Sequence, residues 1–406
     1  MQGKTSEINE RRTALARLAA ATPIGALGLA AGGSAGALLA EEMTGSTAWA
    51  GVPLGVLVLG SALGALLIAR QTTRAGRAAG LMLGYGIGTA GAALVVVAAA
   101  LDDFALLLVG SAGLGAANAA IFLTRYAAAD LGGETGRGRA LGIVFFATAL
   151  GAVVSPNLLG PSGDLAHALG LPRLSGLYLV AMAAFVAAAL VLSRLPRRSG
   201  RLSAGRSVTG ADLRVGLRSA RVALLVLAGA NVVMVAVMAI APVHLVAHGH
   251  SLDFVGVVVS IHVLCMFAPS PLTGWLADRA GSAAVAVLGA ALLATAGLGG
   301  AVLDMSDGTV MTGVLAVLGV GWNAGVVGGS TMLAASVPAL LRPHTEAIGE
   351  IAMGLAAGAG APIAGLIVAF GDFTMLSIAG ALGGLLMLGV LRLGAPARPE
   401  AAVGHL

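Results

Sequence analysis

The chain has 406 residues, of which 58% are hydrophobic and only 10% are charged. Soluble domains average about 25% charged residues, so this composition excludes a water-soluble globular protein. Apolar stretches of about 20 residues recur from end to end, and each is long enough to span the ~30 Å hydrocarbon core of a bilayer. The formal net charge of +5 does not indicate nucleic-acid binding, because the basic residues fall in alternate loops, as membrane topology requires. The sequence therefore predicts an all-α membrane protein.

Twelve membrane-spanning helices are expected, with boundaries uncertain by about 2–4 residues. The first six cover residues 15–39, 48–68, 78–101, 104–126, 139–160 and 175–192. The other six cover residues 222–247, 252–276, 283–303, 309–337, 345–370 and 373–391. At 1.5 Å per residue, each apolar segment is long enough to cross the bilayer.

The charges support this count independently of hydropathy. If the N-terminus is cytoplasmic, every basic residue except Arg173 falls at a cytoplasmic helix end or loop, and the outer connections are acidic. This partition follows the positive-inside rule. Lys4 is the only lysine, which suggests a GC-rich bacterial genome. We therefore expect a multi-pass protein of the bacterial cytoplasmic membrane with both termini in the cytoplasm.

An arginine-rich connection over residues 194–220 divides the chain. Its basic residues are Arg194, Arg197, Arg198, Arg201, Arg206, Arg214 and Arg218. It predicts a cytoplasmic linker between an N-terminal six-helix half, residues 1–193, and a C-terminal half, residues 221–406; binding to anionic lipid headgroups is the alternative. The halves also share short motifs, since the glycine-rich segment before Asn118 resembles the one before Asn323. Internal repeats of this kind are typical of secondary transporters.

The connection after the eighth helix carries a recognisable motif. Residues 274–281 read GWLADRAG, which resembles the G-x-L-x-D-R-x-G loop of the major facilitator superfamily. With twelve helices in two halves, this resemblance implies the fold of that superfamily. It also implies that Asp278 and Arg279, which follow Gly274, close the cytoplasmic gate.

Other motifs of the superfamily are incomplete. The N-terminal copy of the loop keeps Arg74 and Arg77, but Thr73 occupies the acidic position. Ser111 stands near the place of the fourth-helix arginine of proton-coupled exporters, and the fifth-helix antiporter pattern is present only in part, over residues 151–156. Each departure weakens the interpretation as a proton-driven drug exporter.

Four residues of the seventh and eighth helices indicate a metal site near mid-membrane. Met234 and Met238 are four residues apart, as are His262 and Met266, so each pair shares a helix face. At 1.5 Å per residue, both pairs lie ~14–21 Å from the outer surface. Thioether and imidazole together suit a soft metal such as Cu(I). The alternatives are core packing for the methionines and a structural hydrogen bond for His262.

The pattern M-x-x-x-M followed by H-x-x-x-M in these two helices is similar to the signature of the bacterial CcoA-like copper importers. The resemblance implies that these four residues carry copper into the cytoplasm, to supply assembly of cbb3-type cytochrome c oxidase. Copper is then a transported ligand, and no catalytic cofactor is expected. The superfamily resemblance covers nearly the whole chain, whereas the copper signature covers only two helices.

Further candidate ligands surround this set. His244, His248 and His250 cluster with Asp253 at the expected outer mouth, where they either capture copper or are interfacial histidines wetted by headgroup water. Cys265, the only cysteine, faces ~100° away from its neighbour on the eighth helix. It is either an alternate soft ligand or an apolar filler.

Two further groups of polar residues lie in the expected helices. The first group is Asn118, Asn231, Trp322 and Asn323. These side chains either contact the cargo or form hydrogen bonds between helices. The second group, Glu346 and Glu350, provides titratable candidates for ion coupling; a favourable charge at a helix N-terminus explains them equally well.

The sequence thus predicts a secondary transporter, not an enzyme, that imports copper by alternating access of its two halves. We expect it to work as a monomer, with copper ion and membrane lipids as its partners and no nucleic acid. Three other functions remain open. They are export of drugs or natural products, import of a riboflavin-type nutrient, and copper sensing or assembly without transport.

Overall fold

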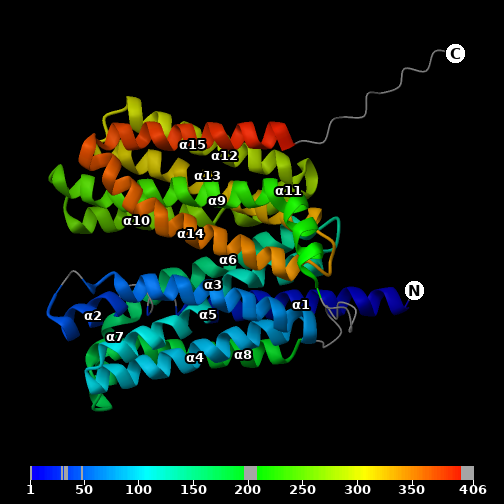
Figure 1. Ribbon diagram of the computed structural model, residues 1–406, viewed down its shortest axis with the longest axis horizontal. Helices are drawn as coiled ribbons and strands as arrows, with labels where there is room; N and C mark the ends of the chain where they lie inside the picture. Colours follow the sequence, from blue (N-terminus) through cyan, green and yellow to red (C-terminus); the bar gives the residue numbers. More distant parts are fainter. Residues whose placement is uncertain (1, 29–30, 32–34, 47–48, 196–207, 395–406) are drawn as a thin grey trace.

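The computed structural model describes residues 2–28, 31, 35–46, 49–195 and 208–394 of the chain. Helices account for most of them and run side by side in a bundle (Figure 1). Within these residues, eleven helices are long and apolar enough to cross a membrane. The segment expected to cross first, residues 15–39, includes positions outside the described ranges. The structure confirms an all-α protein suited to a bilayer.

The N-terminal helices are α1 (Gln2–Ala26), α2 (Gly36–Thr44), α3 (Val52–Ala75), α4 (Arg77–Leu101), α5 (Phe104–Gly132), α6 (Arg137–Val154), α7 (Leu159–Ala168) and α8 (Gly176–Ser193), with short 3-10 turns η3 (Ser155–Leu158) and η4 (Arg173–Ser175). The C-terminal helices are α9 (Gly210–Ala247), α10 (Leu252–Phe267), α11 (Ser270–Ala280), α12 (Ser282–Val302), α13 (Gly308–Ser336), α14 (Arg342–Phe370) and α15 (Phe373–Gly394). Each set packs mainly within itself, and α6 with α11 and α3 with α14 join the two sets (Figure 1).

Two of the expected continuous helices are interrupted where prolines occur. In the segment expected at 139–160, the α-helix ends at Val154, and the chain continues through η3 into α7. The segment expected at 252–276 consists of α10 and α11, with Pro269 between them. Proline lacks the amide hydrogen that an α-helix needs and clashes with the preceding turn. Hydropathy alone does not detect such breaks, because the residues on either side are equally apolar.

The connection expected at 194–220 is shorter than predicted. Helix α9 begins at Gly210, because Thr209 and Asp212 form a capping box in which each side chain bonds the backbone amide of the other. Such a box satisfies amides that have no partner at a helix start. Residues 196–207, with Arg197, Arg198, Arg201 and Arg206, lie outside the described residues, so the linker and the domain division remain predictions.

The two ends of the bundle differ in charge. We call the end formed by Arg74, Arg77, Arg137, Arg139, Arg279 and Arg342 the basic end, and it includes the starts of α4, α6 and α14. We call the opposite end the acidic end; its connections carry Asp102, Asp103, Asp304, Asp307 and Asp372. By the positive-inside rule, the basic end is expected to face the cytoplasm.

The halves touch closely at the basic end, where α6 of the N-terminal half crosses α11 of the C-terminal half. Gly138 and Gly274 meet there with no side chain between the two backbones, and a Cβ on either would collide with the carbonyl oxygen of the other. A Cβ on Gly142 would likewise collide with the Ser270 carbonyl oxygen. Small residues at such crossings allow helices in membranes to approach closely. Glycine at these positions is therefore required for the closed basic end.

We expect Gly274→Val to force α6 and α11 apart, since overpacking a tight contact costs about 1–3 kcal/mol. Ala277 is 5% exposed and faces the same contact. In a Cys265→Ala background, the rate at which a thiol reagent alkylates the cysteine of Ala277→Cys therefore reports separation of α6 and α11. Labelling should be faster with Gly274→Val. The control is Gly313→Val, whose added Cβ meets no atom within 4 Å. Equal labelling rates in the two variants would contradict this account of the crossing.

Candidate functional site

The loops after α3 and after α11 are structural counterparts. Each consists of one glycine between two helices, Gly76 or Gly281, and each glycine has a φ of 93°, a conformation that favours glycine because it lacks a Cβ. Counting back from these glycines, Arg74 corresponds to Arg279, and Thr73 to Asp278. The two copies of the predicted loop motif thus end in a glycine with the same φ, although they differ in side chains.

Asp278 joins the two halves. Its carboxylate accepts hydrogen bonds from the backbone amides of Gly138 (2.7 Å) and Arg139 (2.8 Å). These amides lie at the start of α6, where a negative charge is favoured by both unpaired amides and the helix dipole. Arg279 does not share in this contact, because its guanidinium lies over the Trp275 ring, 5.3 Å from the ring centre. Asp278 is therefore the residue of the motif that closes the basic end.

The N-terminal copy uses an ion pair instead. Thr73 donates locally, to the Arg70 carbonyl oxygen at 2.8 Å. Arg77 takes over the inter-half contact, since its Nε donates to Asp130 in its own half at 2.8 Å, and its Nη2 donates to Glu346 of α14 at 2.9 Å. The missing acid of this loop is thus compensated by an arginine that bridges α5 and α14.

A second ion pair connects the halves deeper in the bundle, between Arg125 of α5 and Glu350 of α14. The Arg125 side chain is 1% exposed and its Nε donates to Ser330 Oγ at 3.1 Å. The charge partition had placed Arg125 at a cytoplasmic helix end, and that placement is wrong: the side chain lies between helices, above the aromatic ring of Tyr126. A charged residue inside an apolar helix usually marks a functional contact, but the helix was expected to end at residue 126, which placed Arg125 at its end rather than seven residues before it.

Both glutamates that were candidates for ion coupling therefore have arginine partners in the other half. Glu346 is paired with Arg77 and Glu350 with Arg125. Buried ion pairs are costly to form, but removal of one partner leaves an uncompensated charge. The closed basic end thus depends on these carboxylates being ionised.

We expect Arg125→Leu and Glu350→Leu each to lower the free energy of unfolding by about 3–5 kcal/mol, since either leaves a buried charge unpaired. The double variant should lose less than the sum. Thermal unfolding of the detergent-solubilised protein measures this cycle. The control cycle uses Arg173→Leu and Asp164→Leu, whose pair is 60% and 69% exposed and should be worth no more than about 1 kcal/mol. If the losses of the two single variants simply add in the double variant, Arg125 and Glu350 do not stabilise each other, which would contradict the ion pair.

Two of the candidate cavity amides form hydrogen bonds between helices. Asn118 of α5 donates to Ser61 Oγ of α3 at 2.8 Å. Asn323 of α13 donates to the Met266 carbonyl oxygen at 2.7 Å and accepts from Thr273 at 2.8 Å. These contacts favour the structural interpretation of both amides, because each contact satisfies polar groups of two neighbouring helices inside the bundle.

The third amide, Asn231, connects three helices of the C-terminal half. It donates to the Met353 carbonyl oxygen of α14 at 2.7 Å, and its Oδ1 accepts from Trp322 Nε1 of α13 at 2.9 Å. Since Asn231 precedes Met234 by three residues on α9, these bonds fix the helix that carries the methionine pair.

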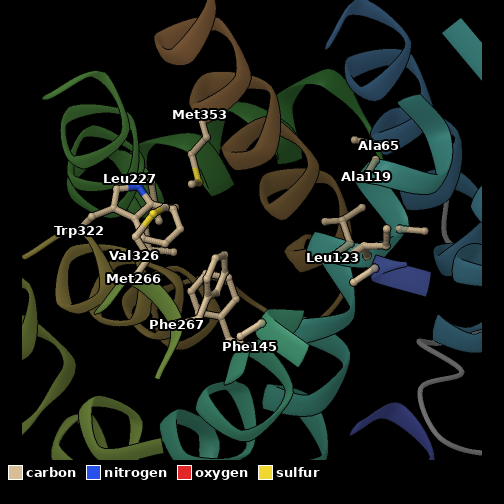
Figure 2. Packing of buried hydrophobic residues seen from close by; sticks show 14 of the residues in the cluster. Ala65, Ala119, Leu123, Phe145, Leu227, Met266, Phe267, Trp322, Val326 and Met353 are labelled. Atoms are coloured by element: carbon tan, nitrogen blue, oxygen red, sulfur yellow. The ribbon is translucent and has the colours of Figure 1, made fainter. Parts of the chain in front are cut away.

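An aromatic cluster of Phe145, Phe267 and Trp322 lies between the halves, with ring centres 5.2 to 5.8 Å apart. Phe145 comes from α6 of the N-terminal half, and the other two come from the C-terminal half. Figure 2 shows these rings close together, with the sulfur atoms of Met266 and Met353 nearby. Met266 directly precedes Phe267, so the predicted metal ligands end where the aromatic cluster begins.

His262 has one ring nitrogen occupied and one free. Its side chain is 1% exposed, and its Nδ1 lies 2.7 Å from the Leu315 carbonyl oxygen of α13. A carbonyl oxygen only accepts, so Nδ1 carries the proton and Nε2 presents a lone pair. Nε2 is buried and has no hydrogen-bond partner among the described residues. In histidines that bind metals, the N–H of the other ring nitrogen characteristically donates a hydrogen bond to a carbonyl or carboxylate in this way.

The other predicted metal ligands occupy two helices. Met266 is 9% exposed on α10, and Met234 and Met238 are partly buried on α9, where they pack against the hydrophobic core. Cys265 is partly buried, with its Cβ directed toward Gly319 of α13. Convergence of the four Met and His side chains on one ion remains a prediction. In the described ranges, no group of three or more His, Cys, Asp or Glu side chains is placed to hold a metal, so binding at mid-membrane would depend on thioethers.

The histidines at the acidic end are arranged differently from the prediction. The rings of His244 and His248 are in contact, with centres 4.2 Å apart and planes tilted by 36°, whereas His250 Nε2 bonds the Ser306 carbonyl oxygen at 2.9 Å. A cavity of about 210 Å³ adjoins the first two, and its acidic lining residue is Asp304 rather than Asp253. Hydrogen bonds from Ser306 hold the pKa of Asp304 below its ordinary value, so this carboxylate is ionised at neutral pH.

Comparison with known proteins places these features in a family. The sequence model of the Major Facilitator Superfamily matches residues 13–326. The chain belongs to this superfamily. As a superfamily member it is a membrane transporter.

Several curated relatives of this superfamily transporter span most of its length. An uncharacterized MFS-type transporter of Bacillus subtilis, YddS, is 35% identical over 382 residues, covering 90% of this chain and 87% of the relative. A second B. subtilis relative, YdeG, is 34% identical over 380 residues, covering 90% and 88%. The riboflavin transporter RfnT of Brucella anthropi is 30% identical over 304 residues, covering 74% and 75%.

Solved superfamily structures confirm the fold. FucP in its outward conformation has a TM-score of 0.76 at 16% identity, covering 94% of this chain and 98% of that one. A bacterial homologue of the iron transporter ferroportin, in an outward-facing state, has the same TM-score, identity and coverage. The twelve-helix fold class predicted from the sequence is therefore supported by similarity to solved structures as well as by the family match.

Proposed function

We propose that this transporter imports copper and that Met234, Met238, His262 and Met266 carry the ion at mid-membrane. The observation that supports this most is the buried Nε2 of His262, whose lone pair has no partner among the described residues. An unsatisfied polar atom in hydrocarbon is costly, and a bound metal would offset that cost. Three thioethers and one imidazole form a ligand set that favours Cu(I) over harder divalent ions.

The contacts between the halves suggest how the ion is released. With the basic end in the cytoplasm, copper enters from the acidic end and meets the aromatic cluster below Met266. Passage requires the halves to separate at Asp278 and at the two arginine–glutamate pairs, as in alternating access. Protonation of Glu346 or Glu350 would remove the charge that holds an arginine of the other half. We therefore retain these two carboxylates as coupling candidates.

We expect copper uptake to fall about 10-fold or more in Met234→Leu/Met238→Leu and in His262→Gln, since loss of a metal-binding group has effects of this size. Leucine keeps the volume of methionine, and glutamine keeps a donor for the Leu315 carbonyl oxygen. The measurement is accumulation of radiolabelled copper in cells that express equal amounts of each variant.

The matched control is Met387→Leu, which alters a methionine that is 4% exposed on α15 and lies outside the predicted ligand set. Its uptake should equal that of the wild type. Equal uptake in all the variants would refute the copper proposal. Copper binding that requires the site without accumulation of copper in the cytoplasm would instead indicate a sensor.

The second candidate function is riboflavin import, which is favoured by 30% identity to the Brucella transporter RfnT over 74% of this chain. A riboflavin carrier needs no soft ligands at mid-membrane. Uptake of radiolabelled riboflavin by the same cells distinguishes the two. Riboflavin accumulation that is unchanged in Met234→Leu/Met238→Leu, together with no copper accumulation, would replace copper with riboflavin as the cargo.

A further inference from the structure

The acidic end of α9 places two imidazoles one turn apart beside a polar cavity. His244 and His248 are four residues apart, and their ring centres are separated by 4.2 Å. Two histidines at this spacing on one helix face are a recurrent arrangement for binding one metal ion. The cavity of about 210 Å³ that they line is large enough for a hydrated ion.

Each histidine of this pair has an Nε2 that is available to a metal. His248 Nδ1 lies 2.8 Å from the His244 carbonyl oxygen, so Nδ1 carries the proton and Nε2 offers a lone pair. The Nε2 of His244 is buried and has no hydrogen-bond partner in the described part of the chain. Both side chains thus have a nitrogen that no protein group uses.

The charges around the cavity favour a cation. Asp304 lines it, and its hydrogen bonds from Ser306 favour the ionised carboxylate. His248 caps the C-terminus of α9, where the helix dipole is negative. No lysine or arginine lines the cavity within the described ranges. A cation that arrives at the acidic end would therefore be attracted to this cavity.

We propose that His244 and His248 form a second metal site, which captures copper outside the membrane core and supplies it to the Met/His site. Nε2 of each histidine binds the ion, and Asp304 compensates its charge. Met238 lies six residues before His244 on the same helix, or ~9 Å along its axis, so the ion has a short path inward. The identity of the metal rests on the proposed function, whereas binding by the histidine pair is measured separately.

The first test counts ions bound to the purified full-length protein in nanodiscs, with Cu(I) titrated against a chromophoric chelator. We expect two ions for the wild type and one for His248→Gln, which alters an exposed side chain and should not disturb folding. Met234→Leu/Met238→Leu should also bind one ion, and the combined variant none. His250→Gln is the matched control, because His250 is bonded to the Ser306 carbonyl oxygen; it should bind two.

The second test measures copper uptake at low concentration. His248→Gln should raise the copper concentration for half-maximal uptake about 10-fold with the maximal rate unchanged, and His250→Gln should not. Two bound ions and wild-type uptake in His248→Gln would overturn the capture site. The capture site and copper import can fail separately. If uptake is lost only in Met234→Leu/Met238→Leu, the protein imports copper but has no capture site at His248. If one ion requires His248 but no copper accumulates in the cells, the capture site exists but the protein does not import copper.

Discussion

Hydrocarbon offers no hydrogen bonds, so every polar group inside the helices must find its partner within the protein. The structure meets this constraint at most of its buried polar side chains. Asn231 bonds Met353 and Trp322, and Arg125 is paired with Glu350. His262 Nε2 is one of six buried side-chain atoms with no such partner in the described residues, and among them it shares a helix face with Met266. The same constraint that explains the packing therefore draws attention to the nitrogen we propose as a copper ligand.

The polar contacts between the halves follow from the same requirement, and they concentrate near the basic end. Asp278 caps α6, and Arg77 and Arg125 meet glutamates of α14. Each contact is strong only while the halves are together, since separation leaves charges that water or another group must then solvate. Between these contacts and the Met/His residues lies the aromatic cluster. The chain thus has a closed basic end with the proposed Met/His ligands on the far side of the aromatic cluster, an arrangement compatible with alternating access.

Much of the fold was predictable, because hydropathy and the distribution of charged residues between alternate loops can be read from local sequence. The helices followed from such patterns, whereas the importance of Asp278 and of the glycine at 281 was implied by the resemblance of residues 274–281 to the superfamily loop motif. The breaks at Val154 and near Pro269 were missed, since the apolar pattern continues across them. The role of Arg125 was also missed, because its partner Glu350 is 225 residues away and pairing at that separation leaves no local signal. Likewise, the sequence placed Asp253 beside the outer histidines, whereas folding brings in Asp304 from another connection.

The central claim is that thioether sulfur and imidazole nitrogen bind the cargo at mid-membrane. X-ray absorption at the copper edge tests it most directly, with one Cu(I) bound to His248→Gln so that only the mid-membrane site is filled. The account predicts scattering from both sulfur and imidazole nitrogen, and loss of the sulfur contribution in Met234→Leu/Met238→Leu. A copper environment of oxygen and nitrogen alone, unchanged by those substitutions, would contradict it.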